Sequence, residues 1–235
     1  MAEKIYTIPV NDAFDSGAEC PVCAMYKKLE DDALSFMMGP SYMEDDIRME
    51  TDKTGYCKPH MTMLLKEKNR LGLALILKTH LDRQKYEALE MAKKGVKKKG
   101  LLKKGEDAPI VKWAREKSES CYICDRIQAM YPRYMDTILY LYRKDEAFRE
   151  KYRSCKGFCQ AHLGELISLA QEKLSEKELQ EFADTTVRLY TENLERVSED
   201  LDWFRYKFDY RYREAPWKNA KDSIERGATK SNSVL

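Results

Sequence analysis

The chain has 235 residues, 35% of them charged, and its 42 basic and 40 acidic side chains leave a net charge of only +2. A chain of this length can bury the core of one large or two modest domains, so size alone does not demand a metal or a disulfide. The near-neutral balance excludes an overall field that would steer the protein to nucleic acid or to a membrane, so such a partner would have to be bound by a local patch.

The amino-terminal stretch MAEKIYTIPVNDAFD has no apolar core behind basic residues and no small-residue cleavage site, which argues against a secretory signal. The longest apolar run, LGLALIL at residues 71–77, is far shorter than the roughly 20 residues that span a bilayer. We therefore expect a cytoplasmic protein without a membrane partner. Seven cysteines, an odd number, argue against a disulfide framework in such a compartment.

The first half of the chain is predicted to be helical. A helix is expected over residues 22–38, and Ser41 with Glu44 forms a capping box that starts a short second helix ending near Gly55. One long helical stretch is then expected over residues 59–94.

The second half repeats this plan, with helices expected over residues 122–143 and 145–154 and a third starting near Cys159. Ser175 and Glu178 form another capping box, which predicts a break and a new helix. In that helix apolar residues recur at alternating steps of four and three, at Val187, Tyr190, Leu194, Val197, Leu201 and Phe204. This seam favours packing inside the chain's own bundle over a dimer-forming coiled coil, because sustained heptads usually need more repeats.

Two sets of three cysteines and one histidine occur in the same order. The first set is Cys20, Cys23, Cys57 and His60, and the second is Cys121, Cys124, Cys159 and His162. The first cysteine and the histidine are 40 residues apart in one set and 41 in the other, and a glycine and an aromatic residue precede the third cysteine in both. These matches indicate a tandem duplication.

A segment rich in Lys and Gly separates the two copies and has the composition of an exposed linker. We predict a first helical unit over residues 1–95, a linker over 96–108, a second helical unit over 109–214 and a tail over 215–235. The fold expected is therefore all-α, with two tandem helical units, the second extended by a long helix and the tail.

Three thiolates and one imidazole are a common ligand set of structural zinc, which is tetrahedral and leaves no open position for a catalytic water. C-x-x-C and C-x-x-H at helix starts place both ligands on one face, where the helix dipole favours thiolates. We predict two Zn²⁺ per chain, with each unit forming one clamp in which a helical hairpin is closed by the metal. The spacing leaves open whether a site takes its ligands from one copy or from both.

Other interpretations of the cysteines are weighed against zinc. Thiolates with histidine also bind iron–sulfur clusters, and Cys155 would then be a spare ligand, although a free thiol is the simpler interpretation. Buried core cysteines are common, but the ordered repeat disfavours them. A redox pair at Cys20 and Cys23 would need a βαβ pattern that the sequence does not contain. His80, without a cysteine neighbour, is interpreted as an ordinary histidine.

The linker lysines could contact phosphates, but no aromatic residue lies among them to stack on bases, so nucleic-acid binding is only weakly supported. They are Lys93, Lys94, Lys97, Lys98, Lys99, Lys103 and Lys104.

Residues 203–227, WFRYKFDYRYREAPWKNAKDSIERG, alternate aromatic and basic side chains. A helix continuing from the seam is favoured there over a strand. The aromatic residues either cap the core or form a surface for a protein partner or self-association, since aromatic and arginine residues dominate interaction hot spots. The candidate surface is Trp203, Arg205, Lys207, Phe208, Asp209, Tyr210, Arg211 and Trp217.

The sequence contains no zinc-protease helix, nucleophile elbow, phosphate-binding glycine loop or dinucleotide fingerprint, so it leans against an enzyme. The function expected is a non-enzymatic, zinc-stabilised helical interaction or regulatory protein. The alternatives are an iron–sulfur redox or sensor protein that uses the same ligands, and nucleic-acid binding through the linker and the tail.

These motifs resemble an uncharacterised bacterial family, a domain of unknown function, with paired CPxC and G[FY]CxxH segments and a C-terminal KFDYR, PW and KD. The matching positions are Cys20 to Cys23, Gly55 to His60, Gly157 to His162, Lys207 to Arg211, Pro216-Trp217 and Lys221-Asp222. The second copy has Tyr122-Ile123 between its cysteines, which removes no ligand. The resemblance supports the duplication and implies no activity.

Overall fold

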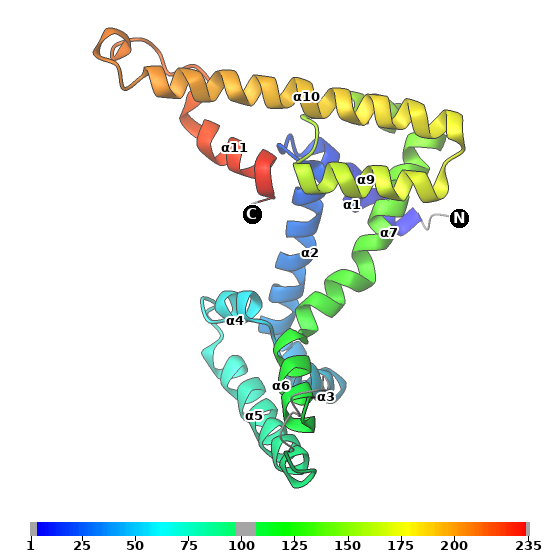
Figure 1. The fold of residues 1–235 in the computed structure, drawn as a ribbon, viewed down its shortest axis with the longest axis vertical. Coiled ribbons are helices and arrows are strands. Elements are labelled where there is room, and N and C mark those ends of the chain that lie inside the picture. Colours follow the sequence, from blue (N-terminus) through cyan, green and yellow to red (C-terminus); the bar gives the residue numbers. More distant parts are fainter. Residues whose placement is uncertain (1–3, 97–106, 234–235) are drawn as a thin grey trace, which may run out of the picture. The chain divides into compact units, whose positions relative to one another are not determined.

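The computed structural model describes residues 4–96 and 107–233, which contain eleven α-helices, four short 3-10 helices and no strand (Figure 1). The predicted all-α class is confirmed. None of the helices in these ranges is both long enough and apolar enough to cross a bilayer.

The chain forms two compact units. Unit 1 comprises Met1–Lys28 and Met130–Leu235, and unit 2 comprises Leu29–Ala129. The chain passes between them inside helices α2 (Pro21–Met38) and α7 (Tyr122–Lys144). The units predicted from the sequence follow the duplication, whereas each compact unit combines segments of both copies.

Unit 1 has a core of aromatic side chains around Tyr152, which is fully buried. Its ring lies 5.2 Å from that of Phe158 and 5.4 Å from that of Phe182. The Tyr152 hydroxyl and the Thr186 hydroxyl share a hydrogen bond of 2.7 Å, so the buried polar ends satisfy each other. Burial of each ring contributes about 1.5–3 kcal/mol.

The helices of unit 1 other than α2 and α7 are η1 (Lys4–Tyr6), α1 (Thr7–Asp15), α8 (Glu146–Ser154), α9 (Gln160–Lys173), α10 (Glu176–Tyr206), η3 (Tyr210–Tyr212), η4 (Ala220–Asp222) and α11 (Ser223–Asn232).

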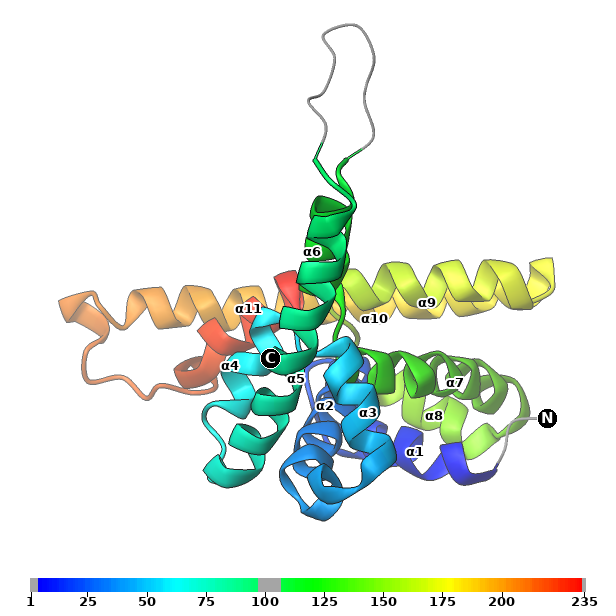
Figure 2. The same ribbon diagram turned by 90° about the horizontal axis from the view of Figure 1, so that it is seen from below.

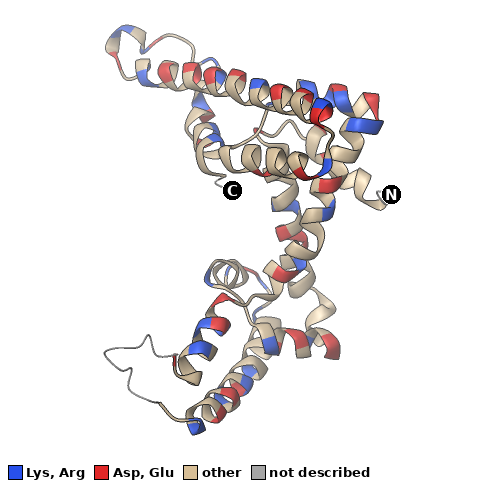
Figure 3. Cartoon of the chain, turned by 45° about the vertical axis from the view of Figure 1, so that its right-hand side comes forward, with Lys and Arg blue, Asp and Glu red and all other residues tan. Residues whose placement is uncertain are grey.

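The long helix α10 begins at the predicted capping box, where the Ser175 backbone N–H donates to the Glu178 carboxylate at 3.1 Å. Helix α9 packs along it, as Figure 1 shows, and α11 contacts both. The predicted seam is only partly buried, because Val187 is 43% exposed. The buried stripe runs instead through Phe182, Thr186, Leu189 and Val197. Charged side chains, more of them acidic than basic, occupy much of the rest of the helix (Figure 3).

Unit 2 is built around α5 (Arg70–Lys93), which packs against α3 (Asp45–Thr54) and α6 (Pro109–Glu119) (Figure 2). The other two helices confined to this unit are η2 (Pro40–Met43) and α4 (Lys58–Leu64). The α5–α6 contact carries a polar cluster at Glu87, whose carboxylate accepts from Trp113 Nε1 at 2.9 Å and pairs with Lys117 Nζ at 2.9 Å.

Two local predictions in unit 2 are wrong. The expected capping box at Ser41 and Glu44 is not formed: Glu44 itself precedes α3 and its side chain makes no cap. The expected single helix over residues 59–94 is two helices, because the Asn69 side chain accepts from the Gly72 backbone N–H at 2.9 Å and starts α5 afresh.

The predicted continuation of α10 into the tail is also wrong, since α10 ends at Tyr206. The Lys207 ammonium is buried and donates to the backbone carbonyl oxygens of Tyr212, Arg213 and Ala215. These bonds fold the chain into a loop that is neither helix nor strand over most of its length. Residues 207–217 are called the aromatic loop below.

Candidate metal centres

All eight residues predicted as metal ligands lie in two clusters, each of three cysteines and one histidine. Within each cluster the ligand atoms all lie within 4.8 Å of one another. Centre A, in unit 1, is Cys20, Cys23, Cys159 and His162, and centre B, in unit 2, is Cys57, His60, Cys121 and Cys124. Each centre therefore combines the C-x-x-C of one copy with the C-x-x-H of the other, and not, as the hairpin interpretation expected, the four residues of one copy.

The distances in centre A suit a single tetrahedral ion. The Sγ atoms of Cys23 and Cys159 are 3.7 Å apart. The Nδ1 atom of His162 lies 3.4, 3.3 and 3.1 Å from the sulfurs of Cys20, Cys23 and Cys159. Zinc bonds of about 2.3 Å to sulfur and 2.0 Å to nitrogen would set edges of about 3.8 and 3.5 Å in a tetrahedron. The cage is therefore near the size that zinc requires.

Two helix starts bring the ligands of centre A together. Cys159 is the N-cap of α9, and its sulfur accepts from the His162 backbone N–H at 3.5 Å. Cys20 stands just before α2, and its sulfur accepts from the Cys23 backbone N–H at the same distance. Free amides and the positive ends of two helix dipoles thus face the sulfurs and stabilise thiolates. All four ligand residues are buried.

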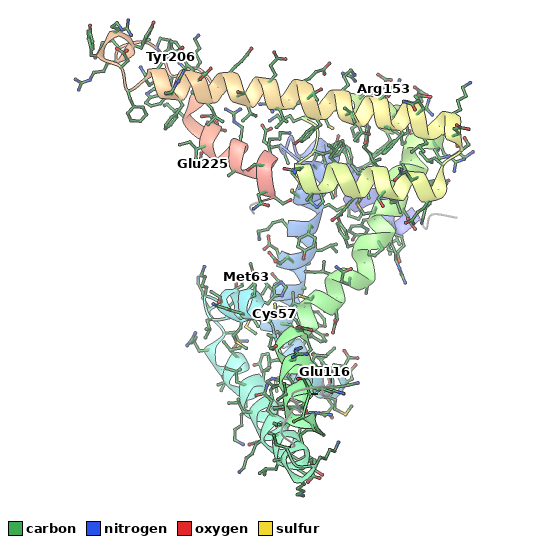
Figure 4. All side chains as sticks on the ribbon, in the orientation of Figure 1. Cys57, Met63, Glu116, Arg153, Tyr206 and Glu225 are labelled. Atoms are coloured by element: carbon green, nitrogen blue, oxygen red, sulfur yellow. The ribbon has the colours of Figure 1, made fainter. Side chains whose placement is uncertain are left out.

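Centre B has the same arrangement of three cysteines and one histidine, but two of its cysteines are more exposed to solvent. The Nδ1 atom of His60 lies 3.2 Å from the sulfurs of both Cys57 and Cys121 and 3.4 Å from that of Cys124. Cys57 and Cys124 are half-buried and their sulfurs are 3.9 Å apart. Cys57 is the N-cap of α4, and Figure 4 labels it at the start of that helix.

The glycine before each C-x-x-H segment is required by its conformation. Gly55 and Gly157 have φ angles of +65° and +75°, in the left-handed region that glycine tolerates best. A Cβ on Gly157 would stand 2.7 Å from the Leu189 carbonyl oxygen, and one on Gly55 would stand 2.5 Å from His80 Nε2. His80 is buried, and its Nδ1 lies 2.8 Å from the Asp52 carbonyl oxygen, so this histidine packs behind centre B.

Glu30 supports centre B from outside the ligand set. Its Oε1 lies 3.2 Å from His60 Nε2, the ring nitrogen that faces away from the cysteines, and Glu30 is 8% exposed. A carboxylate on the second nitrogen fixes the ring orientation and leaves Nδ1 free to bind a metal. The sequence offered no signal for this residue, because Glu30 lies far from both motifs of its centre.

Hydrogen bonds and burial shift the pKa values of the side chains in centre A in opposite directions. Burial raises the pKa of Cys20 to about 12. Hydrogen bonds with Cys20 and Cys23 hold the pKa of Cys159 far below its usual value. Burial would lower the pKa of His162, but its hydrogen bonds with Cys159 and Cys23 raise it to about 10. The four side chains thus share protons that a bound cation would displace.

Centre B shows the same pattern. Although burial alone would raise it, the contact with His60 lowers the pKa of Cys121. Burial and the neighbouring charge of Cys121 raise the pKa of Cys124. The contact with Cys121 in turn raises the pKa of His60 against the effect of burial.

The C-terminal segment supports centre A through two residues that the sequence did not predict. The Ser233 hydroxyl lies 2.9 Å from the sulfur of Cys159. Lys230 is 1% exposed, and its ammonium donates to the backbone carbonyl oxygens of Glu19 and Lys156. Glu19 directly precedes Cys20, so Lys230 ties together the two chain segments that lead into the centre.

Cys155 belongs to neither centre. Its sulfur accepts from the Gly157 backbone N–H at 3.4 Å, and burial raises its pKa to about 11. A thiol with so high a pKa is neutral at pH 7 and a weak nucleophile.

The candidate interaction surface divides into two groups of residues. Trp203 donates from Nε1 to the Pro216 carbonyl oxygen at 2.9 Å, and Trp217 packs on Phe204, so with Lys207 these side chains hold the aromatic loop together. The other group reaches solvent: Phe208 is 76% exposed and Tyr210 is 86% exposed.

The charged members of the surface make local ion pairs. Arg205 pairs with Asp202 and Arg211 with Asp209.

Among the linker lysines, Lys93 pairs with Glu90 at the end of α5, and Lys97, Lys98, Lys99, Lys103 and Lys104 lie outside the described residues.

Comparisons place the chain in a family without adding an activity. No curated protein and no solved structure matches it. A family whose description reads "Family of unknown function (DUF6062)" matches residues 1–235, the whole length of the chain. This agrees with the resemblance carried by the paired cysteine and histidine motifs and by the tail. The chain therefore belongs to this family of unknown function.

Proposed function

We propose that each chain binds two Zn²⁺ ions in closed, structural sites and acts as a helical interaction protein. The observation that carries this proposal is the geometry of the ligands: four soft or borderline donors at tetrahedral spacing, on helix starts whose amides stabilise thiolates. Three thiolates and one imidazole fill the coordination sphere of zinc and leave no position for substrate. The expected role of the metal is therefore to hold the fold.

The same spacing favours one ion over an iron–sulfur cluster. In a cluster the thiolates ligate different iron atoms, which spreads the ligands apart. The sulfur pairs of Cys23 with Cys159, 3.7 Å apart, and of Cys57 with Cys124, 3.9 Å apart, match two ligands on a single ion. Zinc is the expected ion because tetrahedral thiolate and imidazole sites are typical of it.

The interaction role rests on the aromatic loop. Phe208 and Tyr210 are large, exposed and carried by a loop that Lys207 fixes with three hydrogen bonds. Because the loop is ordered before binding, little conformational entropy remains to be lost. Basic residues outnumber acidic ones between residues 203 and 218. The partner that fits is a protein surface with an apolar pocket beside carboxylates.

Elemental analysis of protein purified without a metal-affinity tag and without oxygen tests the metal assignment. About two zinc per chain and no visible absorption are expected. Iron with acid-labile sulfide, or less than one metal per chain, would contradict it.

The interaction assignment is tested by comparing binding partners of the wild type with those of Phe208→Ala/Tyr210→Ala. A protein that binds the wild type in a salt-sensitive manner and is lost in the double variant supports the loop. Val187→Ala is the matched control, because Val187 is an exposed apolar residue of the same unit outside the loop. Equal binding by all three proteins would overturn this role, and self-association lost in the double variant would identify a second copy as the partner.

A further inference from the structure

Unit 1 contains a pocket of about 770 Å³ that neither metal centre uses. This volume lies in the range of small-molecule sites. One wall comes from the end of α8 and the segment after it, another from α10, and the third from the tail and α11. Arg153, labelled in Figure 4, lies on the α8 wall, and the Lys221-Asp222 pair of the tail motif lies on the tail wall.

Each acidic group that lines the pocket pairs with an arginine. Glu19 pairs with Arg196 at 2.5 Å. Arg226 pairs with Asp200 at 2.8 Å and with Asp222 at 3.0 Å. The remaining acidic residue, Glu192, pairs with Arg188 at 2.8 Å, and the lining arginine Arg153 is likewise paired with glutamates outside the pocket.

The lining has six basic and four acidic side chains, and three of the basic ones are lysines. Lys156 Nζ makes a long ion pair of 4.0 Å with Glu19 Oε1. Lys218 and Lys221 make no ion pair with any residue that the structure describes, and both are exposed. The lining therefore carries a net positive charge, and its lysines come from two separate chain segments, the α8–α9 connection and the tail.

The ammonium of Lys218 is held in place. Its Nζ lies 4.1 Å from the centroid of the Trp203 ring, a cation–π contact. Its backbone has a φ of +50°, in the left-handed region that a residue with a side chain adopts at a cost. Strained backbone retained beside a pocket is typical of a residue positioned for binding.

We propose that this pocket binds a small organic anion that carries at least two negative charges, such as a phosphate monoester or a dicarboxylate. Lysine ammonium groups bind both as point charges, with charge-assisted hydrogen bonds. The site binds without covalent chemistry, because the Cys155 thiol on its wall is neutral and no base is paired with it among the described residues. The proposal is independent of the metal and of the aromatic loop as a partner surface.

Calorimetric titration of the full chain with glucose 6-phosphate and with succinate tests the proposal. Both are weak chelators, and metal content measured before and after confirms that the centres are intact. At least one probe should bind saturably, more weakly as salt is added. Lys218→Gln/Lys221→Gln should lose about tenfold or more in affinity, the effect of one or more charge-assisted hydrogen bonds.

Lys66→Gln/Lys68→Gln is the matched control, because it removes the same charge from exposed lysines of unit 2. It should bind as the wild type does. Binding of the sugar phosphate alone identifies a phosphate site, and binding of succinate alone identifies a carboxylate site. No saturable binding of either probe up to about 10 mM, or equal losses in the two variants, would overturn the proposal.

Discussion

The Sγ atoms of Cys23 and Cys159 lie 3.7 Å apart, although 136 residues separate them in the chain. The pair joins the C-x-x-C of the first copy to the C-x-x-H of the second. In centre B the direction is reversed, with Cys57 and His60 of the first copy facing Cys121 of the second. The two centres therefore connect the copies twice: centre A takes its C-x-x-C from the first copy, and centre B takes its C-x-x-C from the second.

This pairing predicts which double variants lose one metal and which lose two. Cys23→Ala and His162→Ala should each retain about one zinc, and so should the two together, because both residues belong to centre A. Cys23→Ala combined with His60→Ala should retain almost none. Elemental analysis distinguishes the alternatives. If each centre formed within one copy, Cys23→Ala/His60→Ala would retain about one zinc and Cys23→Ala/His162→Ala almost none.

Gly157→Ala should empty or disorder centre A. A Cβ would meet the Leu189 backbone oxygen at 2.7 Å, and the φ of +75° would add strain, so the segment that carries Cys159 must move. We expect a loss of about 2–4 kcal/mol in the free energy of unfolding, measured by urea denaturation, and loss of one zinc.

Gly164→Ala is the control for that variant, because Gly164 lies within α9 with no atom within 4 Å of its added Cβ. It should stabilise the protein by about 0.5–1 kcal/mol through helix propensity. Equal zinc content in the two variants would show that the left-handed glycine does not position the ligands.

Glu30→Gln should weaken centre B alone. The glutamine side chain keeps the shape of glutamate but loses the charge that orients His60 through Nε2 at 3.2 Å. The expected loss of zinc affinity is about 10- to 100-fold, measured by competition with a chelator. Glu50→Gln, on the exposed side of α3, is the control and should leave both affinities unchanged. Equal affinities in all three proteins would remove Glu30 from the site.

The sequence identified the candidate ligand residues because their chemistry and spacing are local, but it could not predict which of them lie together. Each C-x-x-C or C-x-x-H motif lies at a helix start. A C-x-x-C motif can meet the C-x-x-H motif of its own copy or that of the other copy, and the sequence does not distinguish the two. The contacts behind the centres were not predicted for the same reason. Glu30, Lys230 and Ser233 lie outside the motifs, and only the packing of α2 and α11 brings them to the ligands.

The end of α10 shows the limit of periodicity. Alternating aromatic and basic residues suggested either a helix or a strand. The segment is instead a loop, which the Lys207 ammonium holds by donating to three backbone carbonyl oxygens. In α10 itself, Thr186 is buried in place of Val187, because its hydroxyl bonds both Phe182 and Tyr152. A hydrophobic pattern gives no weight to a polar residue whose hydrogen bonds are satisfied.

Lys230→Met should detach the C-terminal helix from centre A. The methionine keeps most of the volume but leaves the carbonyl oxygens of Glu19 and Lys156 without their buried donor. Each unsatisfied carbonyl costs about 1–3 kcal/mol, so urea denaturation should show a loss of about 2–4 kcal/mol. Ser231→Ala, which removes only a bond within α11, should cost less than about 1 kcal/mol. Equal stability of the two variants would show that Lys230 does not fasten the helix.

The polar cluster at Glu87 should make the stability of unit 2 depend on pH. Burial opposes ionisation, but hydrogen bonds from Trp113, Lys117 and Arg83 hold the pKa of Glu87 at about 2, below its usual 4.5. A carboxyl group with a lowered pKa in the folded state stabilises it above pH 4.5, and the stabilisation is lost as the pH falls through 2. Glu87→Gln should therefore cost about 1 kcal/mol at pH 7, the scale of a solvent-screened cluster, and progressively less between pH 4.5 and 2.

Urea denaturation of the wild type and the variant at pH 7, 5 and 3 measures this difference, and loss of metal at low pH affects both proteins alike. Glu90→Gln is the control, because the ion pair of Glu90 with Lys93 lies within α5 and does not join it to α6. Its effect should stay within about 0.5 kcal/mol at every pH. A Glu87→Gln cost that does not shrink with acidity would mean that packing of the side chain, and not its charge, joins α5 to α6.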